Sequence, residues 1–245
     1  MFSTNGTMRA MLAIAFLSTE AAAQSATATD STSTIAKLAR RSTASISFIQ
    51  SRPQGAFAQN VGLGYGVNGA YVLRLDDAGI LGLRVDAGIA TYGRESKRTN
   101  LSETVGGRVQ VDVETSNYVV PLTVGPQLSW PTGALRPYVN AGIGGQGFFT
   151  ESTVEGTTTN LPFASTTNHS AWTSAWSFGG GVAVPIHAGS TNVQLDLGAQ
   201  YVAGSRARYL AQGSITDLPN GAISVTPLES VTHMTVVRLG VSVGR

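Results

Sequence analysis

The chain has 245 residues, of which 29 are glycine and only 12% are charged, a composition that excludes disorder throughout and favours a single domain. The 16 basic and 14 acidic residues give a net charge of +2, and the basic residues are scattered apart from Lys37, Arg40 and Arg41, which argues against a nucleic-acid partner. The absence of cysteine excludes a disulfide framework and thiolate zinc sites.

The first 23 residues have the pattern of a secretory signal peptide. No stretch reaches the roughly 20 apolar residues of a transmembrane helix, but Arg9 precedes the short apolar run AMLAIAFL, and small Ala21 and Ala23 follow it. These features are typical of an export signal, and we expect cleavage after Ala23; the alternative is a buried first helix. Residues 24–42 are rich in Ser, Thr and Ala, and we expect a flexible periplasmic lead-in.

Eight segments then alternate between apolar residues and small or polar residues, the pattern of half-exposed β-strands. In one of them Leu83 and Val85 fall on one face, while Arg84 and Asp86 lie between small residues on the other. Most of the segments are longer than the roughly 5–6 residues of an ordinary strand. The predicted strands are 43–50, 62–75, 80–93, 117–130, 135–150, 172–187, 192–205 and 231–244.

The connections between these strands alternate between short and long. Three of them, DDAG, PTGA and HAGSTN, are tight turns rich in Gly, Pro, Asp and Asn. The others are longer and polar, at 51–61, 94–116, 151–171 and 206–230. Tight periplasmic turns at one end and long extracellular loops at the other are typical of outer-membrane barrels. A soluble β-sandwich, the alternative fold, gives no reason for this sorting.

The predicted fold is therefore all-β: an eight-stranded antiparallel up-and-down transmembrane β-barrel over residues 43–245. In lipid, every backbone amide has to be paired within the protein, and a sheet achieves this only by closing into a ring. The apolar faces then meet lipid, and side chains fill the narrow interior. Because buried charges have to be paired, we expect the inward polar residues to form a network that plugs the lumen. Its predicted members are Arg74, Arg84, Asp86, Arg136, Gln194, Asp196 and Arg238.

Aromatic residues near the strand ends predict an interfacial girdle. Amphipathic rings are enriched at the two surfaces of the bilayer, where one edge meets lipid and the other meets water. Five of the residues lie near the long-loop ends of their strands, and one lies beside a tight turn. The predicted girdle consists of Tyr65, Tyr118, Trp130, Phe149, Trp172 and Trp176.

Several stretches together resemble the outer membrane protein β-barrel family, which includes small OmpA- and OmpX-type barrels. They are VGLGYGVNGAYVL, ILGLRVDAGIATYG, GPQLSWPTGALRPYVNAGIG, FGGGVAVPI and VVRLGVSVGR, and the resemblance covers residues 43–245. It implies a place in the outer membrane of a Gram-negative-type bacterium, contact with membrane lipid and lipopolysaccharide, and insertion by the barrel assembly machinery. Its basis is a pattern of strands and turns, so it implies fold and location more than activity.

Signals for catalysis are weak. The stretch GIGGQG at 142–147 matches a dinucleotide-binding pattern but lacks the following helix that such a site requires. The three histidines have no partner at metal-ligand spacing, and we expect no enzymatic activity, cofactor or metal. Some small barrels are lipid A-modifying enzymes that use a histidine with a serine or acidic partner. The corresponding pairs here would be His169 with Ser170 or Glu151, and His233 with Glu229.

Three roles fit the predicted barrel. We expect a structural or surface-interaction role, in which the polar loops 94–116, 151–171 and 206–230 contact an extracellular ligand. The first alternative is a narrow pore for small solutes, and the second is a lipid A-modifying enzyme.

Overall fold

The computed structural model describes residues 41–100, 110–156, 162–187, 191–217 and 223–244. The predicted signal peptide and all but the last two residues of the predicted lead-in lie outside this part of the chain. Among the described residues, no helix is long and apolar enough to cross a membrane.

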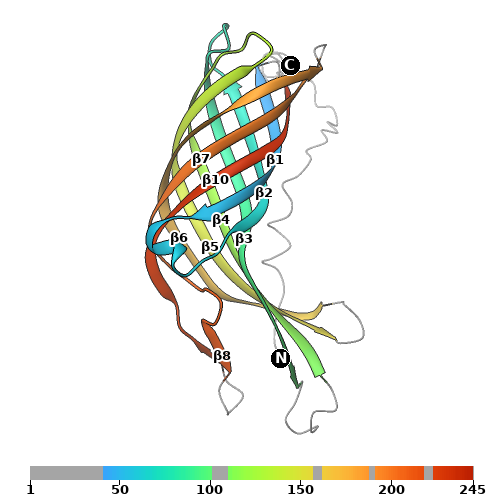
Figure 1. The fold of residues 1–245 in the computed structure, drawn as a ribbon, viewed down its shortest axis with the longest axis vertical. Helices are drawn as coiled ribbons and strands as arrows, with labels where there is room; N and C mark the ends of the chain where they lie inside the picture. The colour runs from blue at the N-terminus through green and yellow to red at the C-terminus, as the bar shows by residue number, and fades with distance from the viewer. Residues whose placement is uncertain (1–40, 101–109, 157–161, 188–190, 218–222, 245) are drawn as a thin grey trace, which may run out of the picture. The chain divides into compact units, whose positions relative to one another are not determined.

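Eight antiparallel strands form a closed ring (Figure 1). Each strand pairs with its neighbours in the sequence, and the last strand pairs with the first, from Thr43 opposite Gly244 to Pro53 opposite Met234. This ring confirms the predicted fold class and excludes the β-sandwich. The strands are β1 (Ser42–Pro53), β2 (Gly64–Arg74), β3 (Leu81–Asn100), β4 (Gln110–Ser129), β5 (Arg136–Gly156), β6 (Pro162–His187), β7 (Asn192–Tyr209) and β10 (Leu228–Gly244).

Three short elements lie in the long connections. The four-residue helix α2 (Gly55–Ala58) joins β1 to β2, and the short strands β8 (Ile215–Asp217) and β9 (Ile223–Val225) form a separate two-stranded sheet between β7 and β10.

Tight turns join the strands at one end of the ring, near the C-terminus in Figure 1. Gly79 and Gly133 have φ angles of 72° and 95°, in the left-handed region that favours glycine. In the first turn, the Asp76 carboxylate accepts hydrogen bonds from the backbone N–H groups of Ile80 and Leu81 at 3.1 and 2.8 Å. The turns therefore lie where the DDAG and PTGA stretches predict them.

The outer surface of the ring is apolar. Side chains such as Ile46, Phe48, Ile143, Phe178 and Leu239 are 52–71% exposed, and they point outward from four different strands. Contiguous apolar surface of this extent is unfavourable in water, whereas it matches the hydrocarbon core of a bilayer. Because the ring has no unpaired edge, its backbone is also satisfied in lipid. The exterior is the lipid-facing surface of a transmembrane barrel.

The structure corrects the predicted loops 94–116 and 151–171, because β3, β4, β5 and β6 continue through much of both ranges. The apolar alternation ends near the predicted strand ends, but backbone pairing continues: Arg98 lies opposite Asp112, and Val113 lies opposite Val154. In the third predicted loop, 206–230, β7 and β10 extend past their predicted ends.

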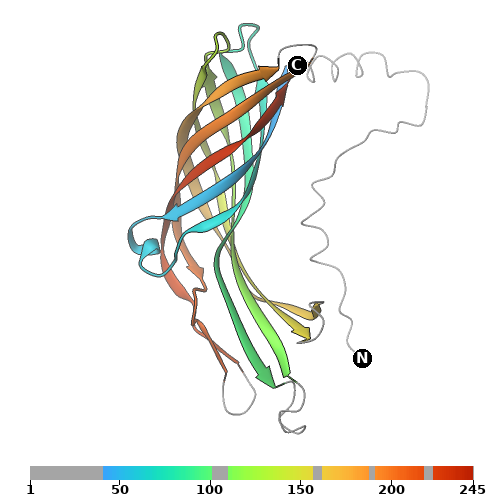
Figure 2. The same cartoon turned by 45° about the vertical axis from the view of Figure 1, so that its right-hand side comes forward.

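The four extended strands form a sheet that bends away from the barrel (Figure 2). Register shifts interrupt the pairing between Thr91 and Gly93 in β3 and between Thr150 and Glu151 in β5, close to the end of the apolar alternation. Bulges of this kind increase twist and redirect a strand. Because outer-membrane barrels carry their longer connections on the extracellular side, we call the part of β3 to β6 beyond these shifts the extracellular sheet.

Candidate functional site

A buried ion pair lies in the barrel interior. Arg84 and Asp86 are two residues apart on β3, so their side chains share the inner face. The Nε and Nη2 of Arg84 donate to the two carboxylate oxygens of Asp86 at 2.6 and 2.8 Å, and Nη1 donates to Gln127 Oε1 at 2.9 Å. The two charged residues are 4% and 7% exposed, so each depends on the other for its partner.

Tyr138 connects this pair to the opposite wall. Its hydroxyl donates to Asp196 Oδ1 at 2.5 Å and accepts from Arg238 Nη2 at 3.1 Å. The guanidinium groups of Arg84 and Arg238 lie 5.6 and 5.7 Å from the Tyr138 ring centroid, within the range of a cation–π contact. Arg238 also donates to Gln200 Oε1 at 3.1 Å. Together these contacts fill the section of the barrel nearer the tight turns.

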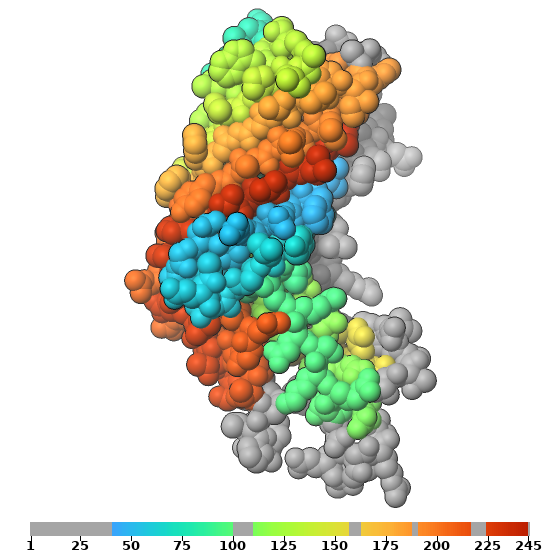
Figure 3. Space-filling model, viewed as in Figure 1, coloured from blue at the N-terminus to red at the C-terminus, as the bar shows by residue number. Residues whose placement is uncertain are grey.

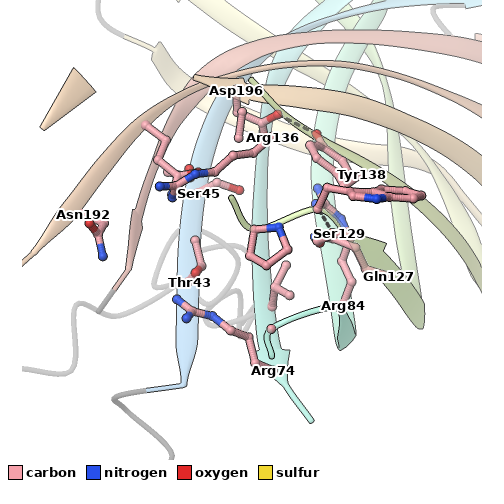
Figure 4. A pocket seen from close by; sticks show the side chains of 17 residues that line it. Thr43, Ser45, Arg74, Arg84, Gln127, Ser129, Arg136, Tyr138, Asn192 and Asp196 are labelled. Atoms are coloured by element: carbon pink, nitrogen blue, oxygen red, sulfur yellow. Dashed lines mark hydrogen bonds between the residues drawn. The ribbon is translucent and has the colours of Figure 1, made fainter. Parts of the chain in front are cut away.

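The structure divides the predicted lumen residues into two groups. The first group belongs to the connected set just described, which we call the polar network. The polar network consists of the predicted residues Arg84, Asp86, Asp196 and Arg238 and of Tyr138, Gln127 and Gln200. The other three predicted members, Arg74, Arg136 and Gln194, line a cavity of about 320 Å³ at the tight-turn end, together with Arg84, Tyr138 and Asp196 (Figure 4). We call it the turn-end cavity.

The sequence prediction left out the uncharged partners of the polar network. Tyr138 lies two residues after Arg136 in the same strand, so the alternation of the strand places both side chains on the inner face. Gln127 and Gln200 likewise alternate with apolar residues. No pattern in the sequence indicated which inward side chains contact one another across the barrel.

The interior nearer the long connections contains a cluster of buried aromatic side chains that the sequence did not predict. Phe57 from α2 is 1% exposed and packs edge-on against Tyr92, Phe148 and Tyr209, with ring centroids 5.0–6.0 Å apart. We call these four residues the aromatic plug. Ile49, Val119 and Met234 belong to the same buried cluster.

The predicted girdle residues lie on the outside of the ring, near its ends. Tyr65, Trp172 and Trp176 are about half exposed toward the long connections, and Trp130 is exposed beside a tight turn. Phe149 packs edge-on against Trp172 with centroids 5.8 Å apart and lies opposite Tyr118 in the β4–β5 register. This placement is compatible with an interfacial role.

A cleft of about 690 Å³ lies beyond the barrel, between the extracellular sheet and the connection from β7 to β8. The connection is attached to β3 by hydrogen bonds from Gln212 Nε2 to the Arg94 carbonyl at 2.8 Å and from the Gly213 N–H to Glu95 Oε2 at 3.2 Å. Figure 3 shows these two parts side by side. The lining is rich in hydroxyl and amide groups, including Thr99, Thr115, Asn117, Thr150, Ser152, Thr166 and Asn168.

Internal hydrogen bonds hold several of these lining side chains in place. Thr115 Oγ1 and Ser152 Oγ are 2.8 Å apart, Asn168 donates to Ser152 at 2.6 Å, and Thr150 donates to Asn117 at 2.6 Å. The cleft therefore presents preorganised polar groups mounted on strands, which restricts their movement more than a loop would.

The extracellular sheet also carries an exposed ion pair that makes its stability depend on pH. Arg98 donates to both carboxylate oxygens of Asp112, at 2.8 and 3.2 Å, and this hydrogen bonding lowers the pKa of Asp112. A carboxylate whose pKa is lowered on folding stabilises the folded form above its unfolded pKa, and this contribution is lost as the pH falls through the lowered pKa.

We therefore expect acidification from about pH 6 to about pH 3 to weaken hydrogen-exchange protection in residues 95–100 and 110–114 relative to the barrel strands. The effect should be small because the pair is exposed. Hydrogen exchange corrected for its intrinsic pH dependence measures it. Asp112→Asn should have weaker protection already at the higher pH and should lose the part of the pH response that comes from Asp112; an unchanged response would contradict this assignment.

The histidine pairs considered from the sequence are not joined by hydrogen bonds in the described part of the chain. His169 Nε2 lies 3.0 Å from the carbonyl oxygen of Arg208. The His233 ring packs against the Tyr201 ring, with the two ring centroids 5.9 Å apart. Glu229 pairs with Arg208 at 3.1 Å. No group of three His, Cys, Asp or Glu side chains among the described residues could hold a metal ion.

No protein-family model matches the sequence, and no curated protein is similar enough to count as a relative. Solved structures of small outer-membrane barrels are similar in fold. Neisserial surface protein A has 12% identity and a TM-score of 0.42, with 83% of this chain and 97% of that chain covered. A major outer membrane protein from Thermus thermophilus has 16% identity, a TM-score of 0.40 and coverage of 81% and 98%.

Ail, the attachment invasion locus protein of Yersinia pestis, solved in complex with the heparin analogue sucrose octasulfate, has 14% identity and a TM-score of 0.38. The match covers 82% of this chain and 95% of that chain. At these levels of identity the likeness concerns the fold alone.

Proposed function

We propose that this chain is an outer-membrane barrel that binds a polar extracellular ligand in the cleft beside its extracellular sheet. The observation that carries the proposal is the cleft itself, in which strands continuous with the barrel hold hydroxyl and amide groups in fixed positions. A cleft of this volume lies within the range of about 300–1,000 Å³ that is common for small-ligand sites.

The filled interior favours this role over the narrow pore. The polar network and the aromatic plug occupy successive sections of the lumen, and Arg84, Arg238, Phe57, Phe148 and Tyr209 are each at most 4% exposed. A solute would have to displace both sets of side chains. The barrel then serves as a membrane anchor for the cleft.

The remaining parts of the proposal follow from the lipid-facing exterior. The barrel would contact outer-membrane lipid and lipopolysaccharide and would be inserted by the barrel assembly machinery. The role involves no catalysis, cofactor or nucleic acid, since binding through hydroxyl and amide groups needs none of them.

Cell adhesion tests the proposed role. Thr115→Trp places a large ring in the cleft, and Ser170→Trp adds the same ring to an exposed position of β6 that does not line the cleft. Cells producing the wild-type barrel are expected to bind extracellular-matrix films, polysaccharide films or sister cells more than cells with an empty vector. Thr115→Trp should reduce this binding several-fold, while Ser170→Trp should leave it unchanged.

Surface amounts of each variant are matched beforehand by the faster migration of the unboiled barrel on a cold detergent gel. Equal adhesion of the vector, wild-type and Thr115→Trp cells to all three surfaces would contradict the proposed role.

A further inference from the structure

The interior at the tight-turn end carries more positive than negative charge. Of the charged residues of the polar network and the turn-end cavity, four are arginines and two are aspartates. Asp86 is engaged by Arg84, and Asp196 accepts from Tyr138. Arg238 donates to Gln200 and to the Tyr138 hydroxyl, both uncharged, and Arg136 brings a further positive charge to the cavity. Among the described residues of this region, which is partly shielded from water, the positive charges therefore outnumber the negative ones by two.

Arg136 shows where an acceptor is missing. Its Nε is buried and has no hydrogen-bond partner among the described residues. A buried donor on a charged group that lacks a partner is more unfavourable than a neutral one. Figure 4 shows the Arg136 side chain at the turn-end cavity together with Arg74 and Arg84.

We propose that the turn-end cavity binds a small soluble oxyanion of the phosphate type. The planar guanidinium group presents paired N–H donors that match two oxygens of a phosphate. Arg136 of β5 brings such a group to the cavity, and Arg74 of β2 and Arg84 of β3 add positive charge. The hydroxyls of Ser45 and Ser129 and the amide of Asn192 add neutral donors to the lining.

The remaining features of the cavity fit an anion. Among the described residues that line it, Asp196 is the single carboxylate, and its Oδ1 is already engaged by the Tyr138 hydroxyl at 2.5 Å. The volume of about 320 Å³ accommodates a phosphate with bound water or a small phosphorylated compound. The site lies at the opposite end of the barrel from the cleft, so it does not depend on the proposed adhesion role.

Trp130 lines the turn-end cavity and provides a direct readout. In a Trp172→Phe, Trp176→Phe background, Trp130 is the one remaining tryptophan. The full chain, folded in detergent micelles, is titrated with inorganic phosphate while chloride keeps the ionic strength constant. We expect a saturable change in Trp130 fluorescence, and Arg136→Gln is expected to weaken the apparent affinity about tenfold or more, since one charge-assisted contact is lost.

Two further variants separate binding from general charge effects. Arg136→Lys keeps the charge and should retain more affinity than Arg136→Gln. Arg52→Gln removes the same charge from an exposed position of β1 outside the cavity and should bind as the wild type does. If Arg136→Gln does not fold, as judged by the heat-dependent shift on a gel, Arg74→Gln takes its place and should also weaken binding.

The proposal is overturned if phosphate produces no saturable change in the wild type, or only the change that chloride produces. It is also overturned if the folded Arg136→Gln or Arg74→Gln variant binds as tightly as the wild type. An equal loss in Arg52→Gln would assign the effect to net charge and would likewise reject a site in the cavity.

Discussion

Asp86→Ala is expected to destabilise the barrel by about 3–5 kcal/mol, because it leaves the Arg84 guanidinium buried without its ionic partner. Arg84 is 4% exposed, and Asp86 accepts hydrogen bonds from both its Nε and its Nη2. The hydrogen bond from Nη1 goes to Gln127, a neutral acceptor. The Tyr138 ring, 5.6 Å from the guanidinium, also remains, but it attracts a positive charge much more weakly than a carboxylate does.

Urea unfolding of the barrel folded in lipid vesicles measures this loss. Asp77→Ala is the matched control, since Asp77 forms an ion pair with Arg41 in which its own side chain is 89% exposed. Surface pairs contribute about 0–1 kcal/mol, so the control should change little. The double replacement Arg84→Leu, Asp86→Val removes both charges and should recover much of the lost stability. If Asp86→Ala unfolds at the same urea concentration as Asp77→Ala, the pair does not hold the interior together.

The closed barrel could be predicted because apolar and polar side chains alternate along its strands and because the tight turns have a distinctive composition. The pattern around Leu83, Arg84 and Asp86 placed each side chain on the face where the structure has it. Gly79 and Gly133 marked the turns that join β2 to β3 and β4 to β5. Local signals of this kind survive in a barrel because each strand pairs with its sequence neighbour.

The contents of the lumen could be predicted only in part. Their charges identified Arg84, Asp86 and Arg238 as members of the interior network. The hydrogen bonds of Tyr138, however, join strands that are distant in the sequence, and the alternation within one strand carries no information about such pairs. The extracellular sheet was missed for another reason. Its parts of β3 and β6 have mainly polar side chains on both faces, so the amphipathic signal weakens although backbone pairing continues.

The aromatic plug was missed because it depends on a connection rather than a strand. Phe148 points inward and Phe149 outward from adjacent positions, so aromatic content alone could not assign either side. Phe57 lies in a segment with no periodic pattern, and nothing local indicates that it enters the barrel. Its position is fixed by the apolar space that Tyr92 and Tyr209 leave between them.

Phe57→Ala is accordingly expected to release the segment 54–63 from the barrel interior while the barrel itself remains closed. The substitution removes a fully buried ring that contacts three others, a change that costs about 3–5 kcal/mol in a protein core. A helix of four residues has no stability of its own, so α2 depends on this side chain for its position. The barrel strands keep their backbone pairing, and the heat-dependent gel shift should persist.

Hydrogen exchange and limited proteolysis across 54–63 measure the release, and Gln59→Ala, at an exposed position of the same connection, is the control. If residues 54–63 are as well protected from hydrogen exchange in Phe57→Ala as in Gln59→Ala, the Phe57 side chain does not anchor the segment. Because the polar network still fills the section nearer the tight turns, we expect no steady conductance from Phe57→Ala in planar bilayers. Open channels in this variant would mean that the aromatic plug alone closes the barrel and that the narrow-pore role has to be reconsidered.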